Sequence, residues 1–396
     1  MSLVIYNAAI LRGRWSGVEW AVWQRAVELA SGKSPDEFVF LVADGVALPS
    51  PLPGGCIVRL PRFVGTRLGR IFHELFLMPR LVRSIVRERG TGNGERGRQS
   101  LISLLSSFIG YLLSPISYLL SPICAEGARE ESGSAAFFAP AYVAPPRLPC
   151  PFTLCLYDLH VFTHPQFCTF ANRLHYRWRM PGSIRRAKTI EVPSEHVRDV
   201  LLERFPNAAG KTVVRHLALR DRYRHPVSDT EKAAVRDKYS LPARYILFVG
   251  DPSPRKNLPA ALAAWQAIQA DGEDIGFVIA GSQDGRTVFG QLSNRQTVKP
   301  SNHRGRIPAP PVAALGYVPD ADMPALYAGA SVLLYPSFDE GYGLPIMEAK
   351  ACGCPVVTSS PTAPEIAPDA FLCGTDETSI TAALRAAFHA NQKALF

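Results

Sequence analysis

Residues 338–349 read FDEGYGLPIMEA, which places the carboxylates Glu340 and Glu348 eight positions apart. The apolar run at 331–335, just upstream, predicts a short buried strand. Pro345 suits the first turn of a helix, where a backbone N–H is not needed. The stretch therefore predicts a strand, a glycine-rich turn and a helix. Glu340 lies before the glycines of the turn, and Glu348 lies in the helix after them.

The turn itself predicts a binding site for an anion. Gly341 and Gly343 allow the backbone to approach a ligand closely, at a place where free amides and the helix dipole favour negative charge. Gly353 marks the end of the helix. Glu348, expected in the first turn, and Glu340 are placed to bind hydroxyl groups beside the anion. A phosphate flanked by two hydroxyl-binding carboxylates is typical of a nucleotide-sugar site.

Strands and helices alternate along most of the chain, which predicts an α/β fold with parallel sheets covered on both faces. The expected strands lie near 3–7, 37–43, 135–139, 152–157, 189–193, 245–249, 277–280, 331–335 and 355–358. The expected helices lie near 17–31, 67–88, 171–187, 194–205 and 258–270. We infer two doubly wound domains, 1–220 and 221–396, with ligands at the carboxyl ends of the strands.

The loop after the strand at 245–249 carries Arg255 and Lys256. Two cations next to a buried strand and at the start of a helix are suited to clamp a diphosphate, since an arginine binds two oxygens at once. Asn257 is expected to cap that helix. Asp251 would repel phosphates, so we expect its side chain to point away or to pair with Arg255.

A longer run, residues 315–372, carries further motifs. These are LGYV at 315–318, ALYA at 325–328, LYPS at 334–337, ACGCPVV at 351–357 and PEI at 364–366. Together with the two glutamates, the run resembles the Glu-x7-Glu segment of retaining GT-B glycosyltransferases. These belong to the large family called glycosyl transferases group 1, which includes many bacterial mannosyl- and glucosyltransferases.

The resemblance implies two Rossmann-like domains that face each other across a cleft, with the acceptor side at 1–220 and the donor side at 221–396. It implies catalytic roles for Glu340, Asp158 and Lys256. The donor-binding residues it implies are Gly17, Arg255, Lys256, Glu340, Gly341, Tyr342, Gly343, Leu344 and Glu348. No metal and no cofactor besides the nucleotide sugar are expected. Tyr157 departs from the family, which carries histidine there, and leaves His160 as a possible substitute.

The function that the resemblance implies is transfer of a hexose from a nucleoside-diphosphate sugar with retention of configuration. The residues around Arg255 most resemble those of relatives that use GDP-mannose as donor. A lipid-linked or growing glycan acceptor fits the basic and apolar insert. A catalytically silent scaffold of the same fold at a membrane is the alternative. A nucleotide-dependent oxidoreductase is disfavoured, because the first strand-to-helix turn lacks a Gly-x-Gly-x-x-Gly fingerprint.

Composition narrows the partners and the compartment. The net charge of +9 over 396 residues suits anionic partners. No zinc-finger, basic-zipper or aromatic RNA-binding pattern occurs, so nucleic acid is not expected. The eight cysteines are scattered, and we read them as reduced. Without a basic and apolar leader, the N-terminus predicts a cytoplasmic protein, either free or peripheral on the inner face of the membrane.

One segment fits neither domain. Residues 62–98 hold nine arginines against three glutamates, and 101–124 hold no charge. Pro115 and Pro122 interrupt the apolar run, which opposes a transmembrane helix. We treat about 92–134 as an insert. An interfacial segment drawn to anionic lipid through 62–124, a loop that packs on its own domain, and a disordered insert all remain open.

Overall fold

The computed structural model describes residues 3–13, 17–34, 37–89, 135–251, 253–281 and 312–393. Unit 1 comprises Met1–Tyr157, Ala171–Val192 and Arg198–Arg215, and unit 2 comprises Asp158–Phe170, Pro193–Val197 and His216–Phe396. The predicted division at residues 220 and 221 stays a prediction. Contacts group two short stretches of the N-terminal half with the C-terminal residues. The predicted insert at 92–134 lies outside the described residues.

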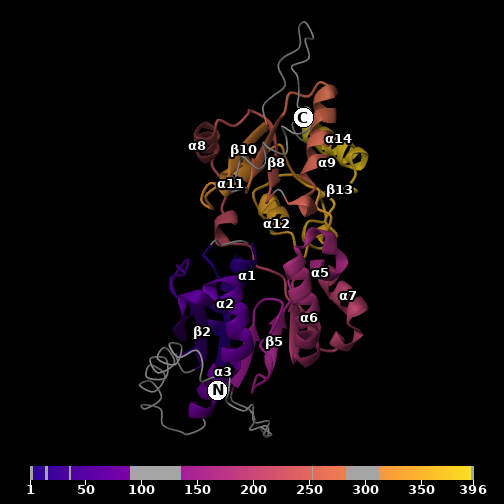
Figure 1. The fold of residues 1–396 in the computed structure, drawn as a ribbon. Helices are drawn as coiled ribbons and strands as arrows, with labels where there is room; N and C mark the ends of the chain where they lie inside the picture. Colours follow the sequence, from indigo (N-terminus) through magenta and orange to yellow (C-terminus); the bar gives the residue numbers. More distant parts are fainter. Residues whose placement is uncertain are drawn as a thin grey trace. The chain divides into compact units, whose positions relative to one another are not determined.

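Unit 1 contains a seven-stranded parallel sheet in the order β3-β2-β1-β4-β5-β6-β7. Figure 1 labels two of its strands, β2 and β5. Its strands are β1 Leu3–Asn7, β2 Phe38–Ala43, β3 Cys56–Leu60, β4 Ala135–Ala139, β5 Phe152–Cys155, β6 Thr189–Val192 and β7 Thr212–Val214. Its helices are α1 Gly17–Ala30, η1 Arg62–Gly65, α2 Arg67–Phe72, η2 His73–Leu77, α3 Met78–Arg89, α6 Phe170–Arg186, α7 Glu195–Arg204 and η4 Pro206–Ala208. The first residues of α6 and α7 fall within the stretches that contacts assign to unit 2.

Unit 2 contains a six-stranded parallel sheet in the order β10-β9-β8-β11-β12-β13. Its strands are β8 Tyr245–Val249, β9 Gly276–Ala280, β10 Val312–Gly316, β11 Val332–Tyr335, β12 Val356–Thr358 and β13 Phe371–Leu372. Its helices are α5 His160–Thr163, η3 Pro165–Phe167, η5 Asp221–Tyr223, α8 Asp229–Tyr239, η6 Pro254–Lys256, α9 Leu258–Ala270, α11 Met323–Ala328, α12 Leu344–Ala351, α13 Ala363–Ile366 and α14 Glu377–Lys393. Both sheets have the doubly wound strand order, so the predicted fold class is confirmed.

The sequence of the central strand β8 is apolar throughout, because helices cover both faces of the sheet. Tyr245, Leu247 and Val249 pack on one face of the sheet against residues of α8, α11 and α12. Ile246 and Phe248 point to the other face, where α9 and α14 cover them. Because successive side chains of a strand alternate between faces, burial of both faces requires an uninterrupted apolar run.

The strands that the sequence analysis did not predict are the edge strands. They are β3, β7, β10 and β13, and each lies at an end of its sheet. In β3 the side chains alternate between exposed and buried, and Val213 of β7 is exposed. An edge strand pairs on one side only and is short, so it lacks the apolar run that identifies a central strand.

Among the described residues, no helix is both long and apolar enough to cross a membrane. The seven cysteines in the described ranges are free thiols.

Candidate functional site

The site of unit 2 lies where the strand order reverses. The chain runs outward from β8 through β9 to β10, and then crosses back to β11 on the other side of β8. In doubly wound sheets a ligand binds at the carboxyl ends of the strands beside such a point. Arg255 and Lys256 follow β8, and Glu340 follows β11. The topology therefore brings together residues that are more than eighty positions apart.

Lys256 is buried next to β11, and two hydrogen bonds hold its side chain. Its side chain donates to Glu340 Oε1 at 2.7 Å and to the hydroxyl of Tyr335, above whose ring it lies at 4.2 Å. Gly250, at a φ of +136°, leaves room for it, since a Cβ there would come within 3.2 Å of Lys256 Cε. A larger residue than glycine would press on the lysine stem.

Glu340 binds both cations of the loop. Arg255 donates at 2.5 Å to the same oxygen, Oε1, that accepts from Lys256. Burial alone would raise the pKa of Glu340, but the charges of Lys256 and Arg255 outweigh it and lower that pKa to about 2. The carboxylate is therefore ionised throughout the physiological range and acts as a hydrogen-bond acceptor rather than as a proton donor.

Glu348 lies beyond the first turn of α12, not in it as predicted, and is 6 % exposed. Its Oε1 accepts from Arg220 at 2.7 Å, and its Oε2 accepts from the Tyr327 hydroxyl at 3.0 Å. Burial raises the pKa of Glu348, although the Arg220 charge acts in the opposite direction. Arg220 also binds Asp320 at 2.9 Å. The carboxylate is thus held in one orientation, with one lone pair of each oxygen still available.

The glycine turn leads into α12 with its carbonyls bound by the protein. Ser194 Oγ donates to the carbonyl of Gly341 at 2.7 Å, and Thr362 Oγ1 donates to that of Tyr342 at 2.6 Å. Gly343 has a φ of +93° at the helix N-cap. Within the described ranges, no protein acceptor is recorded for the amides of Gly341 and Gly343. Unused amides at a helix N-terminus are suited to an anion or to sugar hydroxyls.

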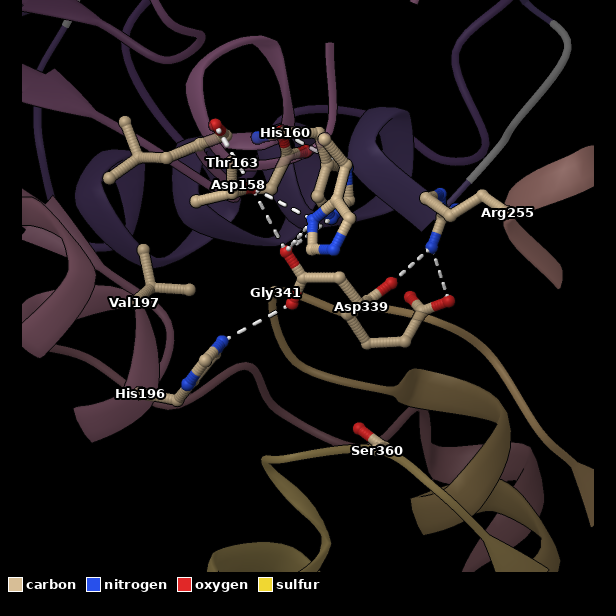
Figure 2. A network of polar contacts seen from close by, with 12 residues as sticks. Asp158, His160, Thr163, His196, Val197, Arg255, Asp339, Gly341 and Ser360 are labelled. Carbon is tan, nitrogen blue, oxygen red and sulfur yellow. Dashed lines mark hydrogen bonds and ion pairs between the residues drawn. The ribbon is translucent and has the colours of Figure 1, made fainter. Parts of the chain in front are cut away.

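Asp339, next to Glu340, is surrounded by three histidines, of which Figure 2 labels His160 and His196. His196 Nε2 lies 3.2 Å from Oδ1, while His164 Nδ1 at 3.2 Å and His160 Nε2 at 3.5 Å approach Oδ2. Burial alone would raise the pKa of Asp339, but the hydrogen bond from His196 and the histidine charges lower that pKa to about 2. Arg255 donates to the Asp339 carbonyl at 2.6 Å, so the segment that carries Glu340 is anchored on both sides.

The predicted site residues fall into two groups. Unit 2 brings together Arg255, Lys256 and Glu340. It also places Asp158 beside the histidines, since the Asp158 carboxylate lies 3.3 Å from His160 Nδ1. Gly17 belongs to unit 1, where it begins α1, and its predicted role toward the donor stays a prediction.

Two expectations for the loop after β8 are resolved. Asn257 is the N-cap residue of α9, but its side chain does not cap the helix; it donates instead to the carbonyl of Thr375 at 2.7 Å. Asp251 is exposed, and among the described residues no ion pair joins it to Arg255. The predicted pairing of Asp251 with Arg255 is therefore not present. The charge of Asp251 still acts on Lys256 and favours the charged form of that lysine, which raises the pKa of Lys256 against the effect of burial.

Several residues of the site were missed by sequence reasoning. Tyr335, Arg220, Tyr327, Asp339 and His196 contact the predicted carboxylates or their segment. His160 and His164 lie four residues apart, just before a proline, and this spacing was the signal in the sequence for the cluster. It could not identify Asp339 as the partner, because that carboxylate lies more than 170 positions away. For Arg220, in a polar linker, the sequence carried no signal.

Metal ligation is a separate question for such a cluster. In the part of the chain that the structure describes, no group of three or more histidine, cysteine, aspartate or glutamate side chains is arranged to hold a metal ion. The histidines instead contact the carboxylate of Asp339 directly.

The sequence of this chain is similar to those of known proteins. Residues 243–389 match the family described as glycosyl transferases group 1. The chain is 35 % identical over 241 residues to O-antigen chain mannosyltransferase B of Escherichia coli, covering 60 % of each chain. It is 25 % identical over 207 residues to O-antigen chain mannosyltransferase RfbU of Salmonella typhimurium, covering 52 % of this chain and 51 % of that one. The matched segments thus span about half to three-fifths of these relatives.

Solved structures share the fold. Anabaena HepE in complex with UDP and glucose superposes with a TM-score of 0.61 at 15 % identity, covering 99 % of this chain and 91 % of that one. WaaG, a glycosyltransferase involved in lipopolysaccharide biosynthesis, gives a TM-score of 0.58 at 14 % identity, covering 97 % and 90 %. The architecture is that of GT-B glycosyltransferases.

Proposed function

We propose that the protein is a nucleotide-sugar-dependent hexosyltransferase, from the premise that residues 243–389 match the glycosyl transferases group 1 family. The donor is GDP-mannose, the acceptor is a growing glycan or a lipid-linked glycan, and the anomeric configuration is retained. The mannosyltransferase names of the two relatives and the residues around Arg255 support mannose.

The observation that carries the proposal is the buried cluster of Arg255, Lys256 and Glu340 at the reversal point of the unit 2 sheet. Two cations share one carboxylate oxygen, so the cluster keeps a net positive charge beside the unused amides of Gly341 and Gly343. A diphosphate is the ligand class that such a positively charged and amide-rich surface favours.

The reaction follows from these positions. The bond between the anomeric carbon and the β-phosphate oxygen breaks, and negative charge develops on the diphosphate. Arg255 and Lys256 stabilise that charge, because preorganised donors in a buried site act strongly on developing charge. The acceptor hydroxyl attacks on the same face, and its proton passes to the departing phosphate oxygen, which gives retention.

The two glutamates position the donor. Glu340, ionised because of its low pKa, accepts hydrogen bonds from hydroxyls of the transferred sugar. Glu348 keeps one lone pair on each oxygen for the ribose hydroxyls, while Arg220 and Tyr327 hold the carboxylate in place. Asp158 orients His160 through its ring and its amide, at the edge of the same cluster. Neither a metal nor a further cofactor enters this scheme.

The first test is a thermal-shift titration with GDP, UDP, dTDP, ADP and NAD. A ligand at 100-fold over its Kd stabilises the folded state by about 2.7 kcal/mol. We expect GDP to raise the melting temperature of the wild type, Glu348→Ala to abolish the shift, and the exposed control Glu377→Ala to retain it. A shift with NAD alone, or with no nucleotide, contradicts the proposal.

Transfer is tested separately with GDP-mannose and an oligosaccharide acceptor. Release of GDP together with mannosyl product of retained configuration supports an active enzyme. Tight GDP binding with neither hydrolysis nor transfer identifies the silent scaffold instead.

A further inference from the structure

Tyr335, the last residue of β11, has a buried hydroxyl whose partner is a charged group. The residue is 1 % exposed and belongs to the apolar core on one face of the unit 2 sheet. A buried tyrosine hydroxyl normally finds a hydrogen-bond partner. Tyr245, on the neighbouring strand β8, donates to the backbone carbonyl of Leu326 at 2.7 Å. The hydroxyl of Tyr335 instead accepts a hydrogen bond from the ammonium group of Lys256.

The side chain of Lys256 is confined on three sides. Its ammonium group lies 4.2 Å from the ring centroid of Tyr335 and donates to Glu340 Oε1 at 2.7 Å. Its stem passes Gly250, where a Cβ would come within 3.2 Å of Lys256 Cε. An ammonium group has three N–H donors, and among the described residues two acceptors are recorded for this one, Tyr335 and Glu340. One N–H is left for a ligand, in a direction that the two protein partners determine.

The charge of Lys256 depends on its neighbours. Burial lowers its pKa, and the charge of Arg255 adds to that effect, while the charges of Glu340 and Asp251 act in the opposite direction. Oε1 of Glu340 also accepts from Arg255, so one carboxylate oxygen serves two cations. A hydroxyl acceptor and the negative face of an aromatic ring both favour the charged form of a lysine. Tyr335 provides both, and burial raises the pKa of its own phenol, which stays neutral.

We propose that Tyr335 is a positioning residue for the transfer reaction, because it holds the Lys256 ammonium group with the remaining N–H directed to the donor diphosphate. The inference rests on the proposed function, which provides the diphosphate. Tyr335 acts through Lys256 and not on the donor itself. Since negative charge on the diphosphate grows as the glycosidic bond breaks, the placement of the ammonium group matters more in the transition state than in the bound donor.

The first test compares two variants that each remove one buried hydroxyl from the same core, Tyr335→Phe and the control Tyr245→Phe. With GDP-mannose and an oligosaccharide acceptor, we expect kcat of Tyr335→Phe to fall about tenfold or more, and KM for the donor to change less than about threefold. The alkaline limb of its pH profile should move to lower pH, because Lys256 loses an acceptor that favours its charged form. Tyr245→Phe should keep the kcat, KM and pH profile of wild type.

The second test follows the titration of Lys256 itself, by carbon NMR of the lysine-labelled full chain without donor. The variant Lys256→Met identifies the resonance. We expect Lys256 to lose its proton at lower pH in Tyr335→Phe than in wild type and in Tyr245→Phe. This measurement needs no transfer activity, so it separates the role of Tyr335 from the proposed function.

Equal titration of Lys256 in wild type and Tyr335→Phe overturns the inference, as does a pH profile of Tyr335→Phe that matches wild type. Equal losses of melting temperature and kcat in both tyrosine variants would leave Tyr335 a purely structural role and also overturn it. A wild type without transfer, in which the Lys256 shift persists, rejects the proposed function and retains Tyr335 as the residue that positions Lys256.

Discussion

The ion pair between Lys256 and Glu340 should be measurable as a coupling energy. The two charged atoms lie 2.7 Å apart, and the side chains are only 11 % and 10 % exposed. Removing one partner of a buried pair is strongly destabilising, by about 3–5 kcal/mol, because the other charge is left without compensation. Glu340→Gln keeps the side-chain volume and one acceptor oxygen while removing the charge.

The lowered pKa of Glu340 gives a second value for the free energy by which its ionised carboxylate stabilises the folded state. The pKa of Glu340 falls from 4.5 to about 2 in the folded protein. At about 1.4 kcal/mol per unit this corresponds to roughly 3 kcal/mol, which Lys256 and Arg255 supply together. Since the folded pKa is depressed, this stabilisation is complete above pH 4.5 and is lost as the pH falls toward 2. The difference between wild type and Glu340→Gln should therefore shrink over that window.

The assay is a double-mutant cycle of Glu340→Gln and Lys256→Met, read by hydrogen exchange of the β8 and β11 amides, which reports unit 2 by itself. We expect the double variant to be less destabilised than the sum of the single variants by about 2 kcal/mol. The exposed pair of Arg385 and Asp271 serves as control, and Asp271→Asn should leave stability almost unchanged. Additivity within about 0.5 kcal/mol, or a pH-independent difference, would refute the argument.

Three further predictions concern the same site. Arg220→Met should weaken GDP binding about tenfold or more in calorimetry, because Glu348 loses the group that orients it; unchanged affinity would exclude that role. Gly343→Ala should lower the unfolding free energy by about 1–2 kcal/mol, since the φ of +93° and the 3.0 Å approach to Ile346 disfavour a Cβ. The measurement is a urea titration, and an unchanged midpoint would contradict this prediction. Asp339→Asn should remove stability that the wild type has above pH 3.8 and loses toward pH 2, as measured by unfolding at several pH values; parallel pH curves would count against the histidine cluster.

The central elements could be predicted because their signals are local. The strands β8, β9 and β11 are apolar without interruption, and the glycine turn with its proline marks the start of α12. The edge strands β3 and β7 could not be predicted in this way, because each is short and its partly exposed side chains give no continuous apolar run.

The sequence could not predict which charged residues of the site pair with one another. The sequence placed Glu340 and Glu348 eight positions apart, and Arg255 beside Lys256, from spacing alone. It could not pair Arg220 with Glu348 across 128 positions. Nor could it place the three histidines around Asp339, or turn the Asn257 side chain from its helix to Thr375.

The sequence by itself determined the fold class, the glycine turn and the identity of the cations and carboxylates, since these depend on residue type and short-range periodicity. The tertiary structure alone decided which charges meet, because a reversal of strand order joins the ends of β8 and β11 at one point. Burial at that point then sets the ionisation of Glu340 and Asp339. Which groups share a buried environment is a property of the assembled sheet, and no local pattern contains it.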